Sequence, residues 1–230
     1  MATKTRQAVF ETVADVLASL GGVSPDRVLV DPVPGTATEK DVLQLYDNYQ
    51  QLFELVDGTL VEKVMGIKEA LLAMYLGHLL ITYSEENGGV GIVAGESGML
   101  RLKKKLVRIP DVAFTRYDRL PNREVPDVNI LELAPDLAVE VLSKKNTKRE
   151  MARKLKDYFQ AGVRLVWYIE PRTRSARVYT SPDDTIEVGP TGTLDGGDVF
   201  PGLRISLQTL FERSGVPASR SQKARKKPRE

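Results

Sequence analysis

A carboxylate inside an apolar stretch is the residue of this sequence best suited to chemistry. Glu140 lies in PDLAVEVLS, whose other residues are typical of a buried strand. Burying an unpaired carboxylate is costly, so Glu140 is expected to have a cation beside it. That cation is either a lysine or arginine in an ion pair, or a metal ion. Side chains alternate along a strand, which places Glu140 on the same face as Ala138 and Leu142.

A metal site would need a second carboxylate, because Mg²⁺ binds proteins through one or two carboxylates together with water and phosphate oxygens. Asp111, in VRIPDVAF, is the best partner for Glu140, since it opens or interrupts another apolar strand. The dipeptide of Pro110 and Asp111 is also common in turns, so by itself it is equally compatible with a turn.

The elements that must position Glu140 form a strand–helix–strand unit. A strand is predicted over residues 137–142, a helix over 148–161 and a second buried strand over 163–169. Thr147 and Glu150 have the spacing of a capping box at the start of this helix. Strands joined in this way are parallel, so we expect residues 137–142 and 163–169 to be neighbours in one sheet.

The remainder of the chain is predicted to be mixed α/β, with turns where glycine, proline and aspartate cluster. Asp57-Gly58 between two apolar runs predicts a β-hairpin. The other predicted elements are helices over 9–20, 38–50, 68–86 and 207–213, strands over 90–94, 99–102 and 107–115, a loop over 117–135, and an antiparallel edge of strands 176–180 and 185–188.

Three segments, IPDVAF, PDLAVEVLS and KLKDYFQAGVRLVWYIEP, together resemble the Uma-two family of restriction-endonuclease-like proteins, within the PD-(D/E)XK nuclease superfamily. The resemblance covers about residues 36–211 and includes FELVDGTLVEK and VFPGLRISLQTLF. It implies a restriction-endonuclease-like αβββαβ core, with a mixed sheet flanked by helices. It also implies hydrolysis of phosphodiester bonds with Mg²⁺ or Mn²⁺ as cofactor.

The resemblance assigns roles to individual residues. Asp111 matches the aspartate of the PD element and Glu140 the acidic residue of the (D/E)XK element, so both are expected to bind the metal. Leu142 stands where the pattern has its lysine, two residues after Glu140. The resemblance implies that the missing lysine comes from the following helix, and Lys154 is the residue expected to supply it.

Three further residues are candidates for the same site. Lys144 lies on the face of Glu140 if the strand continues, which makes it the rival of Lys154. Glu69, at the start of the predicted helix 68–86, resembles the first-helix glutamate of other superfamily members, although the helix dipole also favours a carboxylate there. Glu54, in FELVDG, is another candidate acid.

The charge of the chain is unevenly distributed. The sequence has 33 bases and 31 acids, but its last twelve residues hold six bases and one acid. We expect an N-terminal helical extension and linker over 1–35, an endonuclease-like domain over 36–212 and a basic, disordered tail over 213–230. The absence of cysteine excludes disulfides and thiolate metal sites. No signal peptide or bilayer-spanning stretch is evident, which predicts a cytoplasmic protein.

The function predicted from these observations is metal-dependent endonucleolytic cleavage of nucleic acid, with DNA the favoured substrate. Two carboxylates would hold Mg²⁺ while a lysine assists, and a homodimer would suit cleavage of two strands. Because Leu142 replaces the usual lysine, an alternative is an inactive nuclease-like module that binds nucleic acid or a protein partner. A metal-dependent hydrolase of a smaller phosphoester is a third hypothesis.

Overall fold

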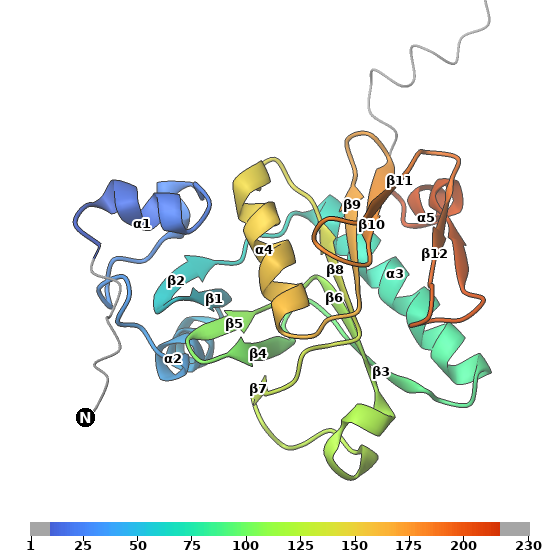
Figure 1. The fold of residues 1–230 in the computed structure, drawn as a ribbon, viewed down its shortest axis with the longest axis horizontal. Helices are drawn as coiled ribbons and strands as arrows, with labels where there is room; N and C mark the ends of the chain where they lie inside the picture. Colours follow the sequence, from blue (N-terminus) through green and yellow to red (C-terminus); the bar gives the residue numbers. More distant parts are fainter. Residues whose placement is uncertain (1–9, 217–230) are drawn as a thin grey trace, which may run out of the picture.

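The strand–helix–strand unit predicted around Glu140 lies at the centre of the structure, a computed structural model that describes residues 10–216 (Figure 1). β8 (Leu137–Val141) pairs in parallel with β9 (Leu165–Glu170), and α4 (Lys148–Gln160) connects the two strands. The predicted parallel pairing is therefore confirmed.

A six-stranded sheet contains this unit, in the order β11-β10-β9-β8-β6-β3. Together with the long helix α3 (Ile67–Glu86), the elements α3, β3, β6, β8, α4 and β9 follow one another as αβββαβ. This is the predicted core, and β10 and β11 form the predicted antiparallel edge. The other four strands of this sheet are β3 (Gly91–Ala94), β6 (Val112–Arg116), β10 (Ser175–Tyr179) and β11 (Thr185–Val188).

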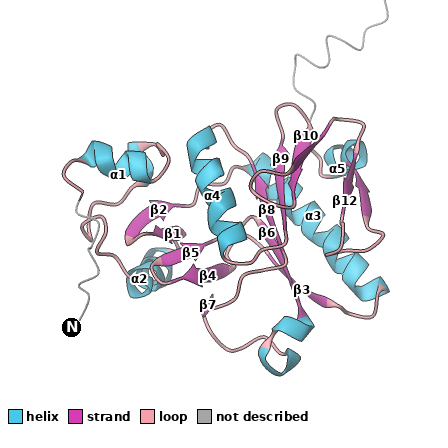
Figure 2. Cartoon of the chain, in the orientation of Figure 1, coloured by secondary structure: helices cyan, strands magenta, loops and turns pink. Residues whose placement is uncertain are grey.

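A five-stranded sheet lies beside the first, in the order β2-β1-β5-β4-β7 (Figure 2). The hairpin of β1 and β2 turns at Asp57 and Gly58, which have φ of 49° and 78°. Two positive φ values are what a tight hairpin turn requires, so the predicted hairpin is confirmed. The strands are β1 (Phe53–Val56), β2 (Thr59–Glu62), β4 (Met99–Lys103), β5 (Leu106–Arg108) and β7 (Ile130–Leu131).

The strand predicted over 107–115 is wrong in one respect, because the structure divides it between the two sheets. β5 ends at Arg108 in the five-stranded sheet, and β6 begins at Val112 in the six-stranded sheet. Pro110 has no N–H to continue a ladder, and the chain crosses between the sheets there. The loop predicted over 117–135 likewise contains β7, which pairs in parallel with β4.

Helices cover both faces of each main sheet. In the six-stranded sheet, Leu137, Val139 and Val141 pack with α3 and α5 (Leu207–Arg213), which lie to its right in Figure 1. Ala138 and Leu142 pack against α4 on the other face, as the alternation of the strand predicts. In the five-stranded sheet, α1 (Val13–Ser19) and α2 (Glu39–Tyr49) cover opposite faces. The remaining strands, β12 (Thr193–Asp195) and β13 (Arg204–Ser206), form a small antiparallel pair, and three short 3-10 helices cover residues Pro25–Arg27, Tyr117–Arg119 and Pro121–Arg123.

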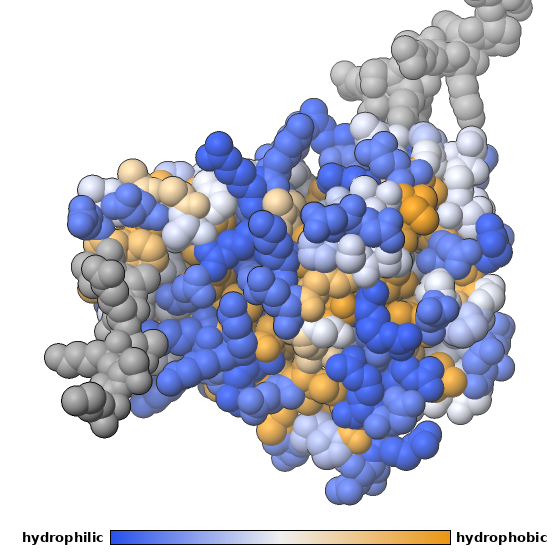
Figure 3. Space-filling view, in the orientation of Figure 1, coloured by the Kyte–Doolittle hydropathy of each residue, from blue (hydrophilic) through white to orange (hydrophobic). Residues whose placement is uncertain are grey.

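The N-terminal segment packs directly on α4. Arg27 forms a buried ion pair with Glu150 at 2.9 Å, and the hydroxyl of Thr147 donates to the carbonyl of Gly21 at 2.7 Å. The side of α4 that faces the viewer is largely hydrophilic in the space-filling view (Figure 3). Most of the predicted tail, 217–230, lies outside the described residues, as do residues 1–9.

Across residues 10–216, none of the helices has the length and apolar character needed to cross a bilayer.

Candidate functional site

Four of the predicted site residues meet at the junction of the two main sheets. Glu54 comes from β1, and Asp111 from the crossing between β5 and β6. Glu140 comes from β8 and Lys154 from α4. All four are buried, with exposed fractions between 2% and 5%. The fold thus gathers residues that are far apart in the sequence into one buried charged cluster.

Glu140 is held at one oxygen by α4. The ammonium of Lys154 donates to Oε1 of Glu140 at 2.7 Å, and the hydroxyl of Tyr158 donates to the same oxygen at 2.5 Å. Lys154 and Tyr158 are four residues apart and share a helix face. Burial alone would raise the pKa of Glu140, but Lys154 and Lys63 outweigh it and lower that pKa. Glu140 is therefore a fixed, ionised carboxylate.

Asp111 is also anchored at one oxygen. Its Oδ2 accepts the backbone N–H of Val141 at 2.5 Å, and its own N–H donates to the carbonyl of Val139 at 3.0 Å. Burial raises the pKa of Asp111 above its usual value, with Lys63 opposing that effect and Glu140 adding to it. The carboxylate therefore has a fixed position beside β8 and a raised proton affinity.

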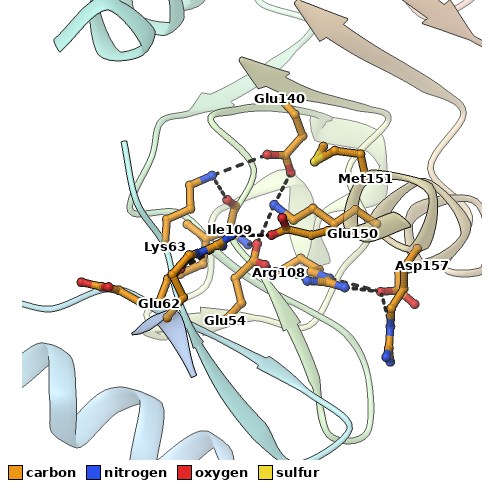
Figure 4. Close-up of polar contacts among 12 residues, drawn as sticks. Glu54, Glu62, Lys63, Arg108, Ile109, Glu140, Glu150, Met151 and Asp157 are labelled. Carbon is orange, nitrogen blue, oxygen red and sulfur yellow. Dashed lines mark hydrogen bonds and ion pairs between the residues drawn. The ribbon is translucent and has the colours of Figure 1, made fainter. Parts of the chain in front are cut away.

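Lys63, which was not predicted from the sequence, lies between the two carboxylates (Figure 4). Its Nζ is 2.6 Å from Oδ1 of Asp111 and 3.7 Å from Oε2 of Glu140. Burial would lower the pKa of Lys63, but the surrounding carboxylates, Glu140 foremost, raise it. The pairing of the hairpin could have indicated Lys63. Val61 lies opposite Glu54, and Lys63, two residues after Val61, is therefore on the same face of the sheet as Glu54.

Arg108, which was not predicted either, holds the lower part of the cluster together (Figure 4). Its guanidinium is 2.7 Å from Oε2 of Glu54 and 2.5 Å from Oδ2 of Asp157. The other oxygen of Glu54 accepts the N–H of Ile109 at 3.1 Å and lies 3.0 Å from Lys154. Burial would raise the pKa of Glu54, but Lys154 and Arg108 hold it well below its usual range. Both oxygens of Glu54 thus already have hydrogen-bond or ion-pair partners.

Glu69 and Lys144, the other two candidates, lie outside this cluster. Both line a neighbouring pocket of about 790 Å³, and Lys144 is exposed because β8 ends at Val141. Within residues 10–216, neither forms an ion pair or hydrogen bond with Asp111 or Glu140. Of the two lysines predicted from the sequence, Lys154 is therefore the one that contacts Glu140.

The arrangement of oxygens suits a small, hard cation. Asp111 and Glu140 each have one anchored oxygen, while the second, Oδ1 or Oε2, faces a shared point where the ammonium of Lys63 lies. Carboxylate oxygens are the donors that Mg²⁺ and Mn²⁺ prefer. The described residues hold no group of three or more His, Cys, Asp or Glu side chains arranged for a metal. The fit thus rests on the pair Asp111 and Glu140.

Comparisons with known proteins agree with this fold. The chain matches the Uma2 family model, described as "Putative restriction endonuclease", over residues 39–208. It is also similar to the crystal structure of a putative nuclease belonging to DUF820 from Anabaena variabilis ATCC 29413. That similarity has a TM-score of 0.66 at 20% identity and covers 77% of this chain and 98% of the other. Among curated proteins, none matches. Since the family match spans more than half of the sequence, the chain belongs to the Uma2 family.

Proposed function

We propose that this protein is a divalent-metal-dependent endonuclease that hydrolyses phosphodiester bonds in nucleic acid, with Mg²⁺ or Mn²⁺ as cofactor and DNA as the favoured substrate. One observation carries the proposal: Asp111, just before β6, and Glu140, in the neighbouring strand β8, each have one anchored oxygen and direct the other at the point where the ammonium of Lys63 lies. Membership of the Uma2 family supports a nuclease over other metal-dependent hydrolases.

Asp111 and Glu140 are the residues that would hold the metal. A bound divalent ion would supply Lewis acidity toward a phosphate oxygen and a water of lowered pKa. Lys154 and Tyr158 fix Glu140 through Oε1, and the backbone of Val141 fixes Asp111 through Oδ2. These interactions keep the other two oxygens, Oδ1 of Asp111 and Oε2 of Glu140, in place before substrate arrives, which is the preorganisation that catalysis requires. Lys154 adds a buried positive charge close to where negative charge would develop.

A basic surface next to the site is suited to the sugar–phosphate backbone. Two adjoining pockets, of about 790 and 540 Å³, share Leu142, Ser143 and Lys144 in the loop that follows β8. Val64, the residue after Lys63, is one of the residues that line the first pocket. The charged residues lining the two pockets are Lys68, Lys144, Lys145, Lys148, Arg172 and Arg177, against Glu69 and Glu170.

Removal of three of these bases is expected to weaken DNA binding regardless of base sequence. For the triple variant Lys144→Ala, Lys145→Ala and Arg172→Ala, the slope of log affinity against log salt concentration should fall by about three, one for each phosphate that no longer has a base beside it. Fluorescence anisotropy over a salt series measures this slope. Unchanged binding would place the nucleic acid on another surface.

A matched triple variant controls for the loss of charge itself. Lys103, Lys104 and Arg204 are exposed bases that line neither pocket. Their replacement by alanine should leave the salt slope nearly unchanged, because distant surface charges are screened.

Cleavage assays with Mg²⁺ or Mn²⁺ on varied DNA and RNA test the proposed function directly. The Lys154→Met variant should cleave about 100-fold more slowly than wild type under single-turnover conditions at saturating DNA, since Glu140 loses its main anchor. Lys144→Met, tested in the same way, should retain the wild-type rate. If Lys144→Met were the slow variant and Lys154→Met cleaved at the wild-type rate, Lys144 would be the assisting lysine.

A second candidate function is a nuclease-like module that binds nucleic acid without cutting it. The observation that favours it is the ammonium of Lys63, which holds the point that a metal would need. Wild-type protein that binds DNA but cleaves no substrate with either metal would support this function and contradict the nuclease.

A further inference from the structure

Lys63 pairs with Asp111 and Glu140 but comes from a different sheet than these two carboxylates. It follows β2 in the five-stranded sheet, whereas Asp111 and Glu140 are anchored to the six-stranded sheet. Its side chain is 7% exposed, and its ammonium also donates to the carbonyl of Ile109 at 2.6 Å. In Figure 4, Lys63 extends toward Glu140 from the side opposite Met151. Its position therefore depends on both sheets.

A divalent ion and this ammonium cannot occupy the same place. Mg²⁺ bound by Oδ1 of Asp111 would lie about 2.0–2.1 Å from that oxygen. The ammonium of Lys63 is 2.6 Å from the same oxygen, and within residues 10–216 it is the cation paired with Oε2 of Glu140. Two cations so close together would repel strongly, so either the metal or Lys63 can neutralise the pair.

A pocket that could receive the displaced ammonium is lined by residues next to Lys63 in the chain. Val64, Met65 and Gly66, the residues directly after Lys63, line the 790 Å³ pocket beside the site. A lysine has a flexible four-carbon stem, so a change of rotamer can carry its ammonium several ångströms. The basic lining of that pocket is where the proposed function places the substrate's phosphates.

We propose that Lys63 is a tethered counter-ion that holds Asp111 and Glu140 together in the metal-free protein and competes with the divalent metal for them. Metal binding displaces its ammonium toward the pocket, where it can pair with a phosphate of the nucleic acid. Lys63 thereby lowers the affinity for metal when substrate is absent and favours binding of metal and nucleic acid together. This inference rests on the proposed function, because it assumes that Asp111 and Glu140 bind a metal.

Titration of the protein with Mn²⁺ in the absence of nucleic acid tests the competition without an activity measurement. Lys63→Met removes the charge and keeps the length of the side chain, so it should bind Mn²⁺ about tenfold more tightly than wild type by calorimetry. Lys68→Met is the matched control, because Lys68 is an exposed lysine of the same pocket. Lys68→Met should change the affinity for Mn²⁺ less than Lys63→Met does.

Thermal unfolding provides a second readout. Without metal, Lys63→Met should melt at a lower temperature than wild type, since Asp111 and Glu140 then repel each other. Saturating Mn²⁺ should close most of that gap, because a ligand that binds the folded state stabilises it. If Lys63→Met does not fold, Lys63→Gln removes the charge and retains a hydrogen-bond donor.

The outcomes separate this inference from the function on which it rests. If wild type binds Mn²⁺ and the Lys63 variants bind it equally or more weakly, Lys63 is not a competitor, and the nuclease proposal still stands. If neither wild type nor the variants bind Mn²⁺ at millimolar concentration, both proposals fail.

Discussion

Asp111→Asn is expected to cleave nucleic acid about 1,000-fold more slowly than wild type, and Glu140→Gln is expected to do the same. Each substitution keeps the shape of the side chain and replaces a charged metal ligand with a neutral amide. A bound metal contributes several kcal/mol to catalysis, and each 1.4 kcal/mol is a factor of ten in rate, which gives this magnitude. Single-turnover cleavage at saturating metal and DNA measures it.

Controls for these two variants come from exposed acids. Asp195→Asn and Glu187→Gln make the same chemical changes on the surface, at β12 and β11, and should cleave at the wild-type rate. Melting temperatures must be compared, since Asp111 and Glu140 are buried. A folded Asp111→Asn protein that cleaves as fast as wild type would remove Asp111 from the proposed site.

Arg108→Met is expected to destabilise the protein by about 3–5 kcal/mol, because it removes the close cation of buried Asp157 and one of the two cations of buried Glu54. The side chains of Arg108 and Glu54 are only 4% and 2% exposed, and that of Asp157 is 8% exposed. Lys154 still contacts Glu54, but Arg153, the nearest other cation to Asp157, is 3.9 Å away. Urea unfolding of wild type and variant gives the difference in free energy.

The matched control is Arg204→Met, which breaks an exposed ion pair with Asp195. In that pair the side chains are 68% and 58% exposed at a separation of 3.1 Å, and such pairs contribute about 0–1 kcal/mol. The comparison isolates burial, since residue type and partner type are alike. If Arg108→Met lowered the free energy of unfolding no more than Arg204→Met does, Arg108 would not be the residue that neutralises Glu54 and Asp157.

Local sequence patterns were sufficient for the strand–helix–strand unit and the hairpin. The apolar run at 137–142, the capping pair of Thr147 and Glu150 and the Asp57-Gly58 turn each determine backbone structure through near neighbours. The capping pair is present, with the hydroxyl of Thr147 accepting the N–H of Glu150 at 3.0 Å. Glu140 could be singled out because its charge conflicts with its apolar neighbours.

The charged partners could not be found in the same way. Lys63 and Arg108 resemble ordinary strand-end bases, and only the packing of two sheets against each other buries them. The division of the predicted strand 107–115 depends on the same packing, because Val107 and Val112 are both apolar strand residues that belong to different sheets. Periodicity along one strand contains no information about which sheet that strand joins.

Residues 109–111, which cross between the two sheets, are hydrogen-bonded to both sheets. The N–H of Ile109 is bound by Glu54, its carbonyl by Lys63, and Asp111 is bound at both ends by β8. A small rotation of one sheet against the other would therefore be converted directly into a change in the spacing of Asp111 and Lys63. The packing of the two sheets therefore sets the distance between the Asp111 carboxylate and the Lys63 ammonium.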